Sequence, residues 1–333
     1  MAEASVTEWV WPKARMTTYG GVVESANGLF KASSWLREGA AVDKCLVTAR
    51  GEFEFGKRLG GGTFGSFYAG IWKTNEKSVG LKKIFQKELL QKEANVLSKI
   101  DHPNIIRFYG VSKMESDFFI VTASLNFGKA LGRNELVEYA KGGSLYDYLH
   151  NPSNGDIDYN QMIIWALQIA SAVAYLHNDA PERMVHCDLK ASNIVLTGEG
   201  VCKLCDFGCS ERLTDSRIAS CDGTPQWMSP EAIDQYVDAS GKEAITTATD
   251  VWSYGVVLWE MISRQEPHES LPPPFIADLM QQEGSPLLIP KRCPAGFVSL
   301  MENCWKRKPR ERYDMRRVIA ELKSMQRDAQ FNK

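Results

Sequence analysis

The chain has 333 residues, of which 44% are hydrophobic and 24% are charged, a composition typical of a globular protein with one large core or two medium ones. Its formal net charge of −2 gives no indication of a nucleic-acid-binding or membrane-surface protein. The start of the chain lacks a basic segment followed by an apolar one, and the most apolar stretch, 251–262, is too short to span a bilayer, so we expect a cytoplasmic protein.

The N-terminal third of the chain predicts strands. Residues 1–50 show no sustained periodicity, and we predict a loosely ordered N-terminal arm there. Residues 53–121 have short, strand-like patterns, interrupted by one helix predicted from about Glu88 to Ile100.

The remainder of the chain predicts helices. Apolar residues recur at helical spacing over 161–177, and 250–262 is apolar nearly all round, as in a helix buried at the centre of a large domain. The last residues, 326–333, form a polar tail that we expect to be frayed. Strands followed by helices predict an α+β protein with a small β-rich lobe and a larger helical lobe.

Three of the eight cysteines, Cys202, Cys205 and Cys209, are spaced closely enough to suggest a metal cluster. However, 201–205 is typical of a strand, in which residues three apart point to opposite faces, and no histidine lies nearby at ligand spacing. We therefore favour reduced thiols in a reducing compartment over a zinc site.

The first candidate site is the glycine-rich segment 60–65, GGGTFG. The pattern G-x-G-x-x-G is weak alone, but the residues after it predict a strand, whereas in a dinucleotide-binding fold a helix follows. A hairpin with a glycine tip can lay backbone N–H groups over phosphates, because no Cβ blocks their approach. The hairpin residues predicted to bind the nucleotide are Leu59, Gly60, Gly61, Gly62, Thr63, Phe64, Gly65, Ser66 and Phe67.

A lysine on the strand predicted at 79–84, Lys82, is a candidate counter-charge for a triphosphate. Such a cation needs a carboxylate to hold it, and Glu93 on the predicted helix can serve. Taken alone, Lys82 is better explained as a solvated surface charge, the usual state of lysine.

The most informative block is HCDLKASN at 186–193, followed by Asp206 in the sequence DFG. Asp188 can accept the proton of a substrate hydroxyl, and Lys190 can contact the transferred phosphate. Asn193 and Asp206 offer the oxygen ligands that Mg²⁺ prefers. Phosphoryl transfer depends mainly on positioning and charge neutralisation, so the block predicts transfer from ATP with Mg²⁺ as cofactor.

Residues 53 to about 325 resemble a eukaryotic protein kinase domain of the tyrosine-kinase-like group, most similar to the ZAK-type, mixed-lineage-kinase-like MAP kinase kinase kinases. The likeness lies in GGGTFGS at 60–66, HPNIIRFYGV at 102–111, GSLYDY at 143–148, CDFG at 205–208 and SYGVVLWEM at 253–261. It implies the two-lobed protein kinase fold over 51–325, with the N-lobe at about 51–137 and the C-lobe at about 138–325. It also implies a serine/threonine kinase whose protein substrate is a downstream MAP kinase kinase in a stress-type cascade.

The resemblance further implies a role for individual residues. Asp188 would be the catalytic base and Lys82 would bind the α- and β-phosphates, while Asn193 and Asp206 would hold Mg²⁺. Asp250 would hold the catalytic loop.

Two other sets of residues resemble family features. Glu231 would pair with Arg312. Lys190 and Thr224 favour a serine/threonine acceptor, whereas Trp227 is shared with tyrosine kinases and leaves dual specificity open.

The chain departs from the family at the catalytic loop, where Cys187 replaces an arginine. In the family that arginine pairs with a phosphate on the activation loop and orders it. Ser216 and Ser220 nevertheless resemble ZAK-type activation sites. Either other cations capture their phosphates, or the loop is ordered by packing and activity is largely constitutive; we favour the second.

Two further departures concern the adenine site. Phe67 and Gly80 stand where the family has valine and alanine, and we expect the larger and the smaller residue to compensate in volume. About fifteen residues, 123–137, separate the strand 118–122 from the hinge-like 138–140, although the family has these adjacent. The segment is an inserted loop or a wrongly assembled sequence, and whether Thr122 or Val137 is the gatekeeper stays open.

An alternative reading is a pseudokinase or scaffold with impaired ATP binding, which the insertion and the altered adenine contacts keep open. Retention of the five candidate residues favours an active enzyme: Lys82, Glu93, Asp188, Asn193 and Asp206. No heptad run appears, so oligomerisation is not evident.

Overall fold

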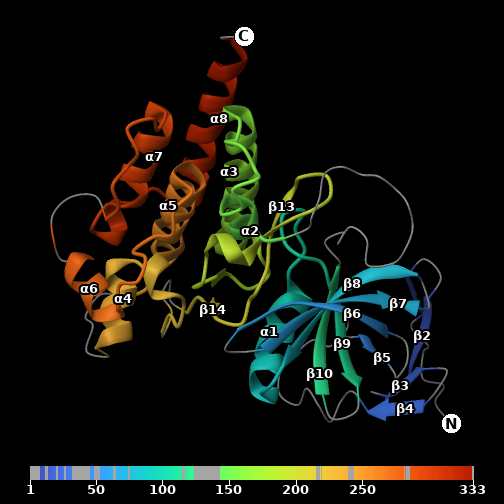
Figure 1. Ribbon diagram of the computed structural model, residues 1–333. Coiled ribbons are helices and arrows are strands. Elements are labelled where there is room, and N and C mark those ends of the chain that lie inside the picture. Colours follow the sequence, from blue (N-terminus) through green and yellow to red (C-terminus); the bar gives the residue numbers. More distant parts are fainter. Residues whose placement is uncertain are drawn as a thin grey trace. The chain divides into compact units, whose positions relative to one another are not determined.

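The computed structural model describes residues 8–11, 14–19, 22–25, 28–31, 46–48, 53–62, 65–73, 76–114, 117–123, 143–214, 218, 220–238, 244–280, 282 and 286–331 (Figure 1). Its contacts divide the chain into two compact units: Met1–Asp101 with Ile106–Gly142, and His102–Ile105 with Gly143–Lys333. The first is built mainly of strands and the second mainly of helices, which confirms the α+β expectation.

The first unit contains a six-stranded sheet in the order β5-β9-β10-β8-β7-β6, of which all neighbours are antiparallel except β5 and β9. Its strands are β5 (Leu46–Thr48), β6 (Phe53–Gly62), β7 (Gly65–Trp72), β8 (Lys77–Ile84), β9 (Phe108–Met114) and β10 (Asp117–Ala123). The predicted helix is α1 (Lys87–Lys99), which lies against β8, β9 and β10. Leu90, Ala94 and Leu97 recur at helical spacing and are buried, so this face of α1 forms part of the core.

The structure describes five short strands within residues 1–50, where the sequence predicts a loosely ordered arm. A separate four-stranded antiparallel sheet contains β1 (Glu8–Trp11), β2 (Ala14–Tyr19), β3 (Val22–Ser25) and β4 (Gly28–Lys31). The fifth, β5, joins the main sheet. Strands of three to six residues are too short for a sustained alternation to be recognised in the sequence.

The second unit is mostly helical, and Figure 1 shows α3 beside α8 and α5 beside α7. Its α-helices are α2 (Leu145–Leu149), α3 (Tyr159–Ala174), α4 (Pro230–Val237), α5 (Ala248–Ser263), α6 (Pro273–Met280), α7 (Ala295–Cys304) and α8 (Met315–Phe331). Its short helices are η3 (Tyr175–Asp179), η4 (Ala191–Asn193), η5 (Pro225–Trp227) and η6 (Pro309–Glu311), and its strands are β11 (Met184–Val185), β12 (Ile194–Leu196), β13 (Cys202–Leu204) and β14 (Glu211–Arg212).

The predicted central helix is α5, in which every residue from 249 to 262 is buried. It ends at Ser263, and the next residue, Arg264, has a left-handed φ of 56°, from which the helix cannot continue. Helix α8 packs against α3 and continues to Phe331, into the segment 326–333 for which the sequence predicts a frayed tail.

Some predictions fall outside the described residues. They concern Thr63, Phe64, Ser216, Val137 and the segment 124–142, which includes most of the predicted insertion and the hinge-like residues. Within the described part of the chain, no helix is long and apolar enough to cross a membrane.

Candidate active site

The first unit contains the ion pair expected between Lys82 on β8 and Glu93 on α1. The Lys82 Nζ donates to both carboxylate oxygens of Glu93, at 2.8 and 3.0 Å. The side chains are only 12% and 4% exposed, so this pair is shielded from water and differs from an ordinary surface contact. The alternative of a solvated lysine is therefore wrong, and the fixed ammonium can act as a phosphate counter-charge.

The glycine-rich hairpin connects β6 and β7, with Gly62 opposite Gly65. Arg58 Nη2 donates to Ser66 Oγ at 3.2 Å across the hairpin. A Cβ at Gly65 would lie 2.0 Å from the carbonyl oxygen of Lys83, so only glycine fits there. β6 and β7 contain the predicted hairpin residues that the structure describes: Leu59, Gly60, Gly61, Gly62, Gly65, Ser66 and Phe67.

The side chain of Phe67 occupies the space that a side chain at Gly80 would need. A Cβ at Gly80 would lie 3.1 Å from Phe67 Cζ and 2.9 Å from Thr122 Oγ1. The volume compensation predicted for these two departures is thus present in the packing. Thr122 Oγ1 is buried and has no hydrogen-bond partner in the described part of the chain.

In the second unit, Asp250 at the start of α5 holds the backbone of the catalytic loop. Its Oδ2 accepts from the N–H of His186 at 2.8 Å, and its Oδ1 from that of Cys187 at 3.0 Å. Although burial opposes ionisation, a hydrogen bond and positive charge from His177, 2.8 Å away, keep the pKa of Asp250 below its ordinary value. These bonds hold Cys187 at a φ of 67°, a strained conformation for a non-glycine residue.

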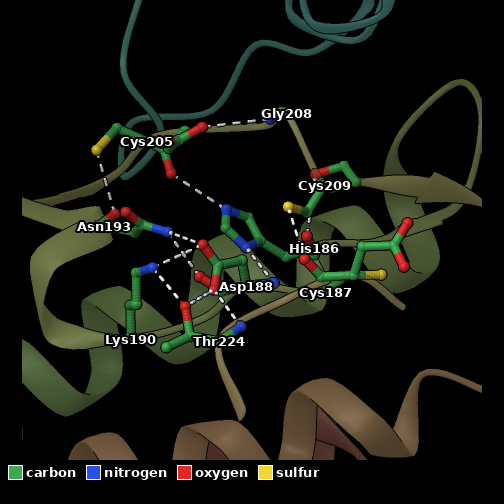
Figure 2. A network of polar contacts seen from close by, with 12 residues as sticks. His186, Cys187, Asp188, Lys190, Asn193, Cys205, Gly208, Cys209 and Thr224 are labelled. Atoms are coloured by element: carbon green, nitrogen blue, oxygen red, sulfur yellow. Dashed lines mark hydrogen bonds and ion pairs between the residues drawn. The ribbon is translucent and has the colours of Figure 1, made fainter. Parts of the chain in front are cut away.

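Three residues contact the carboxylate of Asp188: Lys190 and Asn193 from the predicted block, and Thr224 (Figure 2). Its Oδ2 accepts from Asn193 Nδ2 at 2.9 Å and contacts Lys190 Nζ at 2.9 Å. Its Oδ1 accepts from the N–H and Oγ1 of Thr224, at 2.9 and 2.6 Å, and Lys190 Nζ donates to the same hydroxyl. The carboxylate is therefore fixed from both sides, as a positioned base requires.

A backbone hydrogen bond holds Asn193 next to the residue that precedes Asp206. The N–H of Cys205 donates to the carbonyl of Asn193 at 2.9 Å, and Asp206 follows with a φ of 60°. Phe207 is fully buried with its ring centroid 5.0 Å from that of His186. The Asn193 amide nitrogen donates to both the carbonyl and the carboxylate of Asp188, so its amide oxygen is turned away from Asp188.

Cys187 contacts Cys221 of the activation segment, which we define as residues 206–231. The Cys221 thiol lies 3.4 Å from the Cys187 carbonyl oxygen, and both cysteines are buried. The hydrogen bond with Cys221, with burial, raises the pKa of the Cys187 thiol well above its ordinary value. A neutral, thiol-lined contact thus stands where the family has a cation.

The expected ion pair of Glu231 and Arg312 lies at the C-terminal end of the activation segment. Two parallel bonds of 2.6 and 2.7 Å join the guanidinium to the carboxylate, and both side chains are fully buried. The guanidinium also lies 5.0 Å from the ring centroid of Trp252. This bidentate geometry ties the segment to the loop before α8.

Three functional contacts were not predicted from the sequence: His177 with Asp250, Cys221 with Cys187, and the buried Glu260 with its neighbours. His177 ends the helical periodicity at 161–177, and no local pattern relates it to Asp250, 73 residues later. The burial of Glu260 could have been predicted, because it is the one carboxylate within the apolar stretch 251–262.

Comparisons with known proteins agree with this geometry. A family model described as protein tyrosine and serine/threonine kinase matches residues 53–322. The chain is 44% identical over 285 residues to the mitogen-activated protein kinase kinase kinase zak-1 of Caenorhabditis elegans, an alignment covering 82% of this chain and 35% of that protein. It is 29% identical to mitogen-activated protein kinase kinase kinase 7 of Drosophila melanogaster, over 87% of this chain and 39% of the relative.

A further relative is mitogen-activated protein kinase kinase kinase 12 of Rattus norvegicus, at 31% identity over 79% of this chain and 26% of that protein. The chain therefore spans only between 26% and 39% of the length of these three relatives.

Proposed function

The chain belongs to the protein tyrosine and serine/threonine kinase family, and on this premise we propose that it is a serine/threonine kinase that acts as a MAP kinase kinase kinase. Its β-rich unit followed by a helical unit is the two-lobed fold of that family. The reaction is transfer of the γ-phosphate of ATP to a hydroxyl of a protein, with a MAP kinase kinase as substrate. The kinase kinase kinases among its relatives support this choice.

The cluster at Asp188 is the observation that most directly supports the chemistry. Asp188 orients the acceptor hydroxyl and takes its proton as the new O–P bond forms and the bond from the γ-phosphorus to ADP breaks. Lys190, 2.9 Å from that carboxylate, is placed to compensate charge on the transferred group. The Thr224 hydroxyl bonds to both side chains, and this contact supports the serine/threonine acceptor that Lys190 and Thr224 favour.

ATP and Mg²⁺ suit the residues present. Lys82, held by Glu93, supplies a fixed cation for the phosphates. The amide oxygen of Asn193 and the carboxylate of Asp206 are the hard oxygen donors that would hold Mg²⁺. Bound Mg²⁺ would neutralise negative charge on the phosphates.

A cytoplasmic location is part of the proposal. All seven cysteines that the structure describes are free, which is typical of proteins in a reducing compartment. No observation on the described residues favours the pseudokinase alternative.

Transfer of labelled γ-phosphate to a panel of catalytically inactive MAP kinase kinases, with the modified residues mapped by mass spectrometry, tests the function. We expect labelling on serine or threonine by the wild type and none above background by Asp188→Asn. Labelling only on tyrosine, or on no protein, would contradict the assignment. A rise in melting temperature with Mg·ATP separately tests nucleotide binding.

A further inference from the structure

Two thiols meet where the activation segment contacts the catalytic loop. The Cys221 thiol donates to the carbonyl oxygen of Cys187 at 3.4 Å, and the Cys187 thiol donates to that of Val185 at 3.7 Å. The two cysteine side chains are also hydrogen-bonded to each other, and each residue is only 4% exposed. Thiols are weak donors, so the bonds to the carbonyl oxygens yield readily when a side chain rotates. The two sulfurs are therefore neighbours, and only weak bonds hold them in their present orientations.

The backbones that carry the two cysteines are in contact. A Cβ at Gly223 would lie 2.1 Å from the carbonyl oxygen of Cys187, so the activation segment passes directly over the catalytic loop. The carboxylate of Asp250 fixes the loop by accepting from the N–H of Cys187 at 3.0 Å. The carboxylate of Asp188 fixes the segment by accepting from the N–H of Thr224 at 2.9 Å. A disulfide requires Cα atoms within about 7 Å of each other, and backbones held in contact favour such a bond.

From this arrangement we propose that Cys187 and Cys221 are a redox pair, which hydrogen peroxide oxidises to a disulfide that fastens the activation segment to the catalytic loop. The disulfide links the same two segments that the arginine and the phosphate link in the family. The cysteine at position 187 thus replaces a phosphate-dependent contact with an oxidation-dependent one. Disulfides in reducing compartments are typically transient and redox-sensing.

The oxidation consumes one peroxide for each disulfide. One thiol, as its thiolate, attacks a peroxide oxygen, the O–O bond breaks, and the released hydroxide takes a proton to become water. The second thiol attacks the sulfur of the resulting sulfenic acid, the S–O bond breaks, and a second water leaves with the thiol proton. Each sulfur loses one electron, and the two peroxide oxygens gain both.

The disulfide has two expected consequences. It joins residues 34 apart in the sequence, which restricts the unfolded chain and raises the melting temperature. It also keeps Thr224, three residues after Cys221, at the carboxylate of Asp188, so the oxidised protein retains its kinase activity. The bond itself does not depend on the proposed function, whereas the retained activity rests on it. The hydrogen bond with Cys221, with burial, raises the pKa of the Cys187 thiol, so the pair is oxidised more slowly than an ordinary exposed cysteine.

Peptide mapping tests the bond. The wild type is treated with hydrogen peroxide, quenched with catalase, alkylated with N-ethylmaleimide and digested with trypsin without reductant. Trypsin releases Cys187 in the peptide 184–190, Cys221 in 218–242, and the two half-buried cysteines Cys205 and Cys209 together in 204–212. We expect mass spectrometry to find 184–190 linked to 218–242.

Matched variants complete the test. Cys221→Ser should abolish the linked peptide, and Cys293→Ser, at a half-buried cysteine before α7, should keep it. The melting temperature of the wild type should rise on oxidation and return with dithiothreitol, whereas that of Cys221→Ser should not rise. The rate of peptide phosphorylation by the oxidised wild type should stay within about threefold of that of the reduced protein.

Each other outcome overturns a stated part of the proposal. If both peptides are recovered only in alkylated form, or if 204–212 is linked to either of them instead, Cys187 and Cys221 are not the redox pair. A linked pair with an unchanged melting temperature, or with activity lost on oxidation and restored by dithiothreitol, means that the disulfide does not hold the segment in its active arrangement. A linked pair in a protein that phosphorylates nothing in either state contradicts the proposed function and leaves the disulfide standing. If Cys221→Ser fails to fold, the linked peptides of the wild type and of Cys293→Ser decide.

Discussion

The thiol of Cys221 lies 3.4 Å from the backbone carbonyl oxygen of Cys187, so the activation segment is bonded to the catalytic loop at the position where the family has an arginine. The next residues reinforce this contact. A Cβ at Gly223 would lie 2.1 Å from the same carbonyl oxygen, and Thr224 bonds to Asp188 through both its N–H and its hydroxyl. Packing and hydrogen bonds thus order residues 221–224 without a phosphate.

The first prediction concerns phosphorylation of the activation segment. We expect the double variant Ser216→Ala with Ser220→Ala, assayed on freshly dephosphorylated protein, to retain activity within about threefold of the wild type. The reason is that position 187 carries no cation with which a phosphate on the segment could pair. Rates of peptide phosphorylation measure this. Thr224→Ala is the positive control, since it removes the hydroxyl bonded to Asp188. A loss of two orders of magnitude in the double variant would show that phosphorylation activates this kinase despite Cys187.

A second prediction concerns the base. Asp188→Asn should leave the melting temperature nearly unchanged and lower kcat by about 10²–10⁴-fold, because the acceptor proton loses its carboxylate. The matched control is Asp156→Asn, at a surface residue whose side chain is 74% exposed, and it should retain wild-type kcat. More than a tenth of wild-type turnover in Asp188→Asn would remove Asp188 from the mechanism.

The third prediction concerns the contact of Phe67 with Gly80. Gly80→Ala alone places a methyl group 3.1 Å from Phe67 Cζ and 2.9 Å from Thr122 Oγ1, so it should lower the melting temperature and raise KM for ATP. Phe67→Val alone should raise KM for ATP, because the aromatic ring is lost and Gly80 has no side chain to fill the space that the ring occupied.

The double variant Phe67→Val with Gly80→Ala should recover most of both losses, since the smaller side chain at position 67 makes room for the methyl group at position 80, and that methyl group fills the gap. The coupling free energy should fall within about 0.5–3 kcal/mol. Ser78→Ala, an exposed residue of the same strand, serves in a control cycle with Phe67→Val, where the effects should add. Additive losses in the Phe67 and Gly80 cycle would mean that the two residues do not compensate.

Motif order and family resemblance predicted the ion pair of Lys82 with Glu93, that of Arg312 with Glu231, and the bonds from Asp250 to the catalytic loop. Residue spacing alone could not predict these contacts, because the partners of Arg312 and Asp250 lie 81 and 64 residues away in the sequence. The contact of Cys221 with Cys187 escaped prediction for the same reason, as the resemblance offers no cysteine at 187. The strands before residue 50 escaped because each is too short to show a period.

The last prediction concerns Glu260 on α5, whose side chain is fully buried. Its Oε2 accepts from Trp227 Nε1 at 3.2 Å, and its Oε1 lies 3.3 Å from His150 Nε2. Burial raises the pKa of Glu260 from 4.5 to about 8. At neutral pH the carboxyl therefore keeps its proton in the folded protein, so its contact with His150 is a hydrogen bond and not an ion pair.

The direction of the pH dependence follows from this shift. The folded state binds the Glu260 proton more tightly than the unfolded state does. The contribution of Glu260 to the free energy of unfolding is therefore fully present below pH 4.5 and is lost as the pH rises towards about 8. Glu260→Gln keeps an oxygen that can accept from Trp227 and an amide that can bond to His150, but it does not titrate. We expect its free energy of unfolding in urea to fall less steeply than that of the wild type between pH 5 and 8. Glu302→Gln, at an exposed glutamate of α7, should follow the wild-type curve. Parallel curves for the wild type and Glu260→Gln would mean that Glu260 is ionised in the folded protein across this range.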